Sequence, residues 1–90
     1  MTEKQGAPEE TPIGEVSHYF SKAGVAAIEL SDRLAVGQRI HIRGHTTDLI
    51  TSVDSMQIEH EQVAQAGPGA SIGIKVSEKV RPGDMVYLAK

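Results

Sequence analysis

The sequence QRIHIR, residues 38–43, alternates strictly between polar and apolar side chains. Successive side chains of a β-strand point to opposite faces, so Ile40 and Ile42 would share one face and the arginines the other. This alternation is typical of a strand that has one buried and one exposed face. The sequence therefore predicts a half-buried strand at residues 38–43.

The residues that follow allow this strand to pair with a neighbour. Residues 44–47, GHTT, would reverse the chain. Arg43 would then face Asp48, and Ile42 would face Leu49, which matches opposite charges and apolar side chains across the pair. The register predicts an antiparallel hairpin.

Short apolar runs separated by glycine, proline and aspartate continue on both sides of the hairpin, as is typical of an all-β protein. In the segment after the hairpin the apolar positions change parity between Val53 and Met56, which predicts a bulge or bend near residues 54–55. Pro82 and Gly83 would form the centre of a type II turn. We expect six strands, at about 13–20, 25–30, 38–43, 47–60, 71–76 and 85–89.

A sheet whose strands each have one apolar face can bury those faces and remove its exposed edges by closing into a barrel. The sequence therefore predicts an all-β domain over residues 13–90, a small closed six-stranded antiparallel barrel. Residues 1–12 are polar, acidic and without periodicity, so we expect a disordered N-terminal tail. The expected core consists of Val16, Ile28, Leu30, Leu34, Ile40, Ile42, Leu49, Val53, Met56, Ile58, Ile72, Ile74, Val76, Val86 and Leu88.

Several residues outside the regular alternation have an expected structural role. Leu34 and Val36 would together fill one end of the barrel. A positive φ is expected at the turn glycines Gly37, Gly44 and Gly83. Gly73 lies within the strand expected at 71–76, where it predicts a bend or a close backbone approach.

The composition limits the classes of function. The chain has 90 residues, a net charge of −3 and no cysteine, which excludes disulfides, a thiolate nucleophile and a cysteine zinc site. It has no run of about 18 apolar residues and no apolar leader, so we expect a cytoplasmic protein without membrane contact. A phosphate-binding G-x-x-x-x-G-K-[S/T] loop is also absent, so we expect no nucleotide to be bound.

Catalytic and metal-binding patterns are weak in this sequence. Neither Ser52 nor Ser55 lies in a G-x-S-x-G elbow. The neighbours in residues 59–61, EHE, would point to opposite faces of a strand. His41 and His45 would lie about 13 Å apart on a strand, too far to share one metal ion. We therefore expect a protein that is not an enzyme and has no catalytic, cofactor or metal site.

Basic side chains gather in two parts of the sequence. One group would lie on the outer face of the strand at 38–43 and its turn, where an RNA backbone could lie along it. Pairing with Asp48 and Asp54 on the next strand would instead neutralise this stripe, and such surface pairs contribute only about 0–1 kcal/mol. The second group lies near residues 75–81. The candidate anion or RNA contacts are Arg39, His41, Arg43, His45, Lys75 and Arg81.

Six motifs occur in order: GEV at 14–16, LAVGQRIHIRG at 34–44, VDSMQ at 53–57, AGPG at 66–69, IGIKV at 72–76 and VRPGDMVY at 80–87. Together they resemble domain 2 of elongation factor Tu and related translational GTPases, and the resemblance covers residues 13–90. Stand-alone translation elongation factor-like proteins share the pattern, as does a barrel at the C-terminus of some collagenase-type peptidases. The resemblance implies a β-barrel that contacts the aminoacyl end of tRNA or the ribosome.

Three functions follow from these observations. The leading hypothesis is a non-enzymatic, translation-factor-like binding module that contacts RNA, a ribonucleoprotein such as the ribosome, or a protein partner. The alternative is an accessory domain for protein interaction or substrate positioning, like the barrel appended to collagenase-type peptidases. The third is a structural protein that self-associates through an uncapped strand edge.

Overall fold

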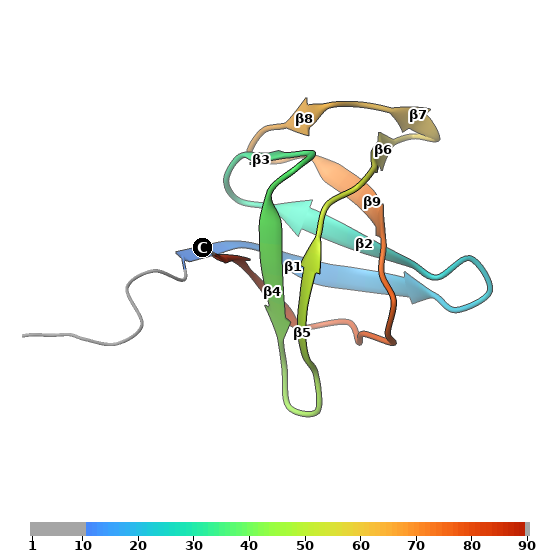
Figure 1. Ribbon diagram of the computed structural model, residues 1–90, viewed down its shortest axis with the longest axis vertical. Coiled ribbons are helices and arrows are strands. Elements are labelled where there is room, and N and C mark those ends of the chain that lie inside the picture. Colours follow the sequence, from blue (N-terminus) through green and yellow to red (C-terminus); the bar gives the residue numbers. More distant parts are fainter. Residues whose placement is uncertain (1–10, 90) are drawn as a thin grey trace, which may run out of the picture.

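The computed structural model describes residues 11–89, and all regular structure in this part of the chain is β-strand (Figure 1). The all-β prediction is thus confirmed. None of the described segments is a helix that could span a membrane. The strands are β1 Thr11–Phe20, β2 Val25–Leu30, β3 Leu34–Ala35, β4 Arg39–Arg43, β5 Asp48–Ser52, β6 Met56–Ile58, β7 Glu61–Gln62, β8 Gln65–Ala66, β9 Ser71–Lys75 and β10 Met85–Ala89.

Eight of these strands form one antiparallel sheet in the order β5-β4-β10-β1-β2-β9-β6-β7, and β3 pairs separately with β8. The sheet curls, so that the β4–β5 hairpin crosses β1 and β2 in the view of Figure 1. Within residues 11–89 no ladder joins the terminal strands β5 and β7. The described part of the chain therefore contains ten strands instead of six, and closure into a barrel stays a prediction. Of the predicted tail, Thr11 and Pro12 belong to β1, and the rest lies outside the described residues.

The β4–β5 hairpin has the predicted register. Ile42 faces Leu49, and Arg43 faces Asp48. Ile42 is completely buried, whereas Arg43 is exposed, as the alternation of a strand with one buried face requires. The structure thus confirms the half-buried strand and the antiparallel hairpin that the sequence predicted.

The bend predicted after β5 is present and divides one expected strand into two. β5 ends at Ser52 and β6 begins at Met56, and both Val53 and Met56 are buried. β5 pairs with β4, whereas β6 pairs with β9 and β7. The bend thus takes the chain from β5, at one edge of the sheet, to β6 near the other edge. The side chains of Val53 and Met56 both remain buried.

One apolar core lies inside the curled sheet. Leu34 is buried in it, but Val36 is 40% exposed, so only one of the two residues expected to fill the end does so. Ile58, Val76 and Leu88, also expected in the core, are partly buried against it. The buried apolar residues are Ile13, Val16, Ala26, Ile28, Leu30, Leu34, Ile40, Ile42, Leu49, Val53, Met56, Ala66, Ile72, Ile74, Val80 and Val86.

The turn glycines have two different physical roles. Gly83 has a φ of 95°, and the Asp84 N–H donates to the Arg81 C=O at 3.1 Å, as the predicted type II turn requires. Gly37 also has a positive φ, of 99°. The φ of Gly44 is not positive, which corrects the prediction. A Cβ at that position would lie 1.8 Å from Asp84 Oδ1, so Gly44 is required by a close contact.

Candidate functional site

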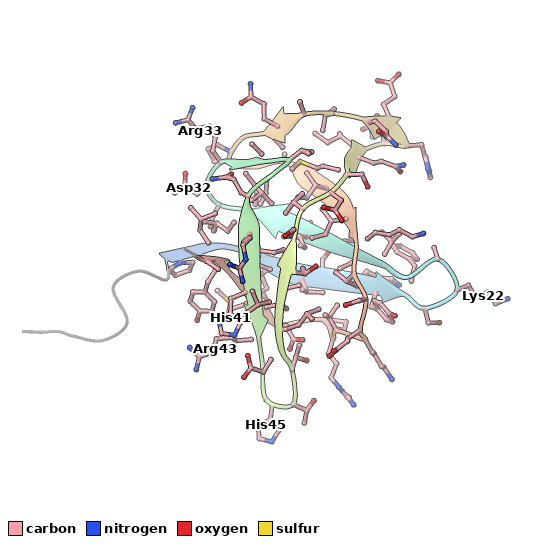
Figure 2. The ribbon with its side chains drawn as sticks, in the orientation of Figure 1. Lys22, Asp32, Arg33, His41, Arg43 and His45 are labelled. Carbon is pink, nitrogen blue, oxygen red and sulfur yellow. The ribbon has the colours of Figure 1, made fainter. Side chains whose placement is uncertain are left out.

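The predicted basic stripe is present on β4, but part of it is engaged by neighbouring side chains. Arg39, His41 and Arg43 alternate along β4, and Figure 2 shows His41 and Arg43 on this strand with His45 at its turn. His41 Nε2 lies 2.5 Å from Asp48 Oδ1 on β5. The Arg43 guanidinium carbon lies 6.0 Å from the centre of the Tyr87 ring. The pairing with Asp48 is the interaction that the alternative interpretation of the stripe predicted.

The second basic group is divided between two parts of the structure. Arg81 lies in the turn before β10, and its N–H donates to Asp84 Oδ2 at 2.9 Å. Asp84 in turn contacts Gly44, so this turn packs against the β4–β5 turn. Lys75 ends β9, which β10, β1 and β2 separate from β4 in the sheet order. RNA contact by these residues stays a prediction.

Residues 59–61 do not form part of a continuous strand, which corrects an expectation. Glu59 and His60 are the two loop residues between β6 and β7, where Ile58 pairs with Glu61. Both have a positive φ, of 51° and 69°, in the left-handed region that disfavours side chains. Among the described side chains no group of three or more metal-ligating residues converges.

A groove that sequence reasoning missed crosses the outer face of β2, β9 and β6. It consists of two adjoining hollows, of about 590 and 520 Å³, and we call it the Gly73 groove. Gly73 faces Ala27 on one side and Gln57 on the other. A Cβ at Gly73 would lie 3.2 Å from Val25 Cγ1. Because glycine has no side chain, the surface is hollowed at this position. The residues shared by both hollows are Lys22, Ala23, Val25, Gln57 and Gly73.

The two hollows of the groove differ in chemistry. The larger one is lined mostly by apolar atoms and includes Phe20, which is 50% exposed. The smaller one adds the neutral polar residues Ser55 and Gln62 and the cation Lys75. In sequence, the small residue at 73 within a strand was the available signal. It predicted a bend or a close backbone approach, whereas β9 pairs with β2 in regular register and the group that closely approaches Gly73 is the Val25 side chain.

No family model matches this chain. An uncharacterized protease of Methanocaldococcus jannaschii is 44% identical over 79 residues, which cover 87% of this chain and 19% of that protein. A collagenase of Porphyromonas gingivalis is 41% identical over 81 residues, which cover 88% of this chain and 22% of the collagenase. The chain thus spans about a fifth of the length of these curated relatives.

The fold also matches solved structures. The C-terminal domain of a putative U32 peptidase of Geobacillus thermoleovorans matches with a TM-score of 0.82 at 17% identity, over 87% of this chain and 91% of that domain. The selenomethionine variant of the same domain matches with a TM-score of 0.81 at 18% identity, over 84% of this chain and 96% of that domain. At these low identities, the TM-scores show a shared fold alone.

The matches overturn the resemblance to domain 2 of elongation factor Tu and the translation-factor role that it implied. The motifs behind it combine strand alternation with turn glycines such as Gly83. Those features specify a backbone path, and unrelated binding surfaces can be built on the same path. Over most of its length, this chain is similar to one part of a curated protease and of collagenases, and it has the fold of the C-terminal domain of a putative U32 peptidase.

Proposed function

We propose that this chain is a non-catalytic accessory domain that binds extended polypeptide and positions it for a peptidase. The observation that supports this proposal is the 41–44% identity to about a fifth of a protease and a collagenase. Most of the length of those proteins lies outside the matched part. A separate binding role for the matched part is therefore consistent with its small size and side-chain-filled core.

The test is to mix the purified chain with fluorescent gelatin and with a reduced, carboxymethylated protein. Gelatin is chosen because the relatives include collagenases. Fluorescence anisotropy measures binding, and gel electrophoresis measures cleavage. We expect both polypeptides to bind and to remain intact. Cleavage by the chain alone, or a lack of binding to both polypeptides, would overturn the proposal.

A further inference from the structure

The larger hollow of the Gly73 groove has a mostly apolar lining, which suits a large apolar side chain. Its floor consists of small or apolar residues, among them Val25, Ala27 and Gly73. Phe20 stands at its edge with half of its surface exposed, and its ring centre lies 4.7 Å from that of His18. An exposed aromatic residue beside a hollow with an apolar lining is typical of a surface that binds a partner's apolar group.

The smaller hollow offers hydrogen-bonding groups for a peptide backbone. Ser55, Gln57 and Gln62 line it, and amide and hydroxyl side chains both donate and accept hydrogen bonds. No side-chain hydrogen bond within residues 11–89 engages these three residues. They are therefore available to the N–H and C=O groups of an extended segment that crosses the groove.

Charge distinguishes the two ends of the groove. Lys75 lines only the smaller hollow and Lys22 borders both, and neither lysine has a carboxylate partner among the described residues. Glu59 lies at the larger hollow, together with His60. An acidic side chain on the segment would be attracted to the lysines and repelled by Glu59, which fixes the direction of the segment.

The same charges favour a polypeptide over RNA. A nucleic acid carries one negative charge per nucleotide, and its binding depends on many cations along the backbone. The groove instead combines neutral amides, an apolar floor and Glu59 with only two lysines in its described lining.

We propose that the Gly73 groove binds an extended polypeptide segment that carries a large apolar residue next to an acidic one. The apolar side chain occupies the larger hollow beside Phe20, and the acidic side chain lies between Lys22 and Lys75. This proposal rests on the proposed function, the binding of extended polypeptide. It adds the site of binding and the residues that the site prefers.

The test uses short Gly/Ser peptides with a central Phe-Glu or Phe-Lys pair and measures their dissociation constants. The variant Lys22→Glu with Lys75→Glu should bind the Phe-Glu peptide about tenfold more weakly and the Phe-Lys peptide more tightly. The variant Phe20→Ser should weaken both peptides about tenfold. Because all three side chains are exposed, the variants should keep the melting temperature of the original chain.

The matched control is Arg33→Glu with Lys79→Glu, which makes the same change in net charge at two exposed residues outside the groove. It should leave both dissociation constants nearly unchanged. Equal losses in the control and the groove variants would overturn the proposal. If gelatin bound the original chain and every groove variant equally, the groove assignment would fail and the proposed function would stand. If the original chain bound no polypeptide, both would fail.

Discussion

At the scale of single residues, Gly44 and Asp84 hold two turns of the structure against each other. Asp84 is 5% exposed, and its Oδ2 accepts a hydrogen bond from the Arg81 N–H. Its Oδ1 occupies the space where a Cβ of Gly44 would lie. A buried carboxylate that already has a backbone partner cannot move away from a new methyl group without losing that hydrogen bond.

The substitution Gly44→Ala should therefore lower the free energy of unfolding by about 1–3 kcal/mol. Urea denaturation measures this loss. The matched control is Gly67→Ala, because a Cβ at Gly67 meets no atom within 4 Å. In an Asp84→Ala background the cost of Gly44→Ala should largely disappear, since the two residues are coupled by contact. Equal losses for Gly44→Ala and Gly67→Ala would contradict this account.

The turn between β6 and β7 is a second residue-scale feature, because both of its loop residues are left-handed. Replacing Glu59 by Asn and His60 by Gly introduces the pair that two-residue hairpin turns of this kind prefer. We expect the free energy of unfolding to rise by about 1–2 kcal/mol, because glycine has no Cβ that opposes a positive φ and asparagine tolerates this conformation. Thermal unfolding measures the gain. The exposed control Glu78→Asn should change little, and a loss of stability in the turn variant would refute the prediction.

At the scale of elements, the two faces of the β4–β5 hairpin should respond very differently to the same substitution. Ile42 has no exposed surface, whereas Ile50 on the paired strand is 50% exposed. Ile42→Ala should cost about 2–5 kcal/mol because it leaves a cavity in the core. Ile50→Ala should cost less than about 1 kcal/mol. Urea midpoints of the two variants provide the comparison, and similar costs would contradict the observed register.

The elements that the sequence predicted well are those whose own residues carry an alternating pattern. β4 and β9 each bury alternate apolar side chains, β10 buries Val86, and all three were predicted close to their observed bounds. The strands β3, β7 and β8 have two residues each, too few to show a period. Their pairing depends on distant neighbours, such as Leu34 opposite Ala66, which a local pattern does not contain.

The candidate site was harder to predict than the strands for a related reason. The Gly73 groove joins residues 20–27, 55–62 and 71–75, which the sheet brings together. Its main feature is a side chain that is missing, and an isolated glycine in a strand has several structural explanations. The alternation of Arg39, His41 and Arg43 on β4, in contrast, follows from one strand, and anion binding by these residues stays a prediction.

At the scale of the whole molecule, the net charge of −3 and the contact of His41 with the Asp48 carboxylate oppose strong binding to RNA. We expect tRNA to bind more weakly than gelatin and to dissociate at about 0.15 M salt, because phosphate contacts weaken steeply with ionic strength. A salt titration followed by anisotropy tests this. Binding that persists at this salt concentration and loses salt dependence in Arg39→Ala with Arg43→Ala would instead support the predicted RNA contact.

The position of β1 between β2 and β10 has a consequence for biosynthesis. Thr11 pairs opposite Leu88, and β10 also supplies the partner of β4. A nascent chain that ends before Met85 therefore leaves β1 and β4 each with only one of its two neighbours, β2 and β5 respectively. Because pairings so distant in sequence form slowly, the domain is expected to fold only after its last strand has emerged.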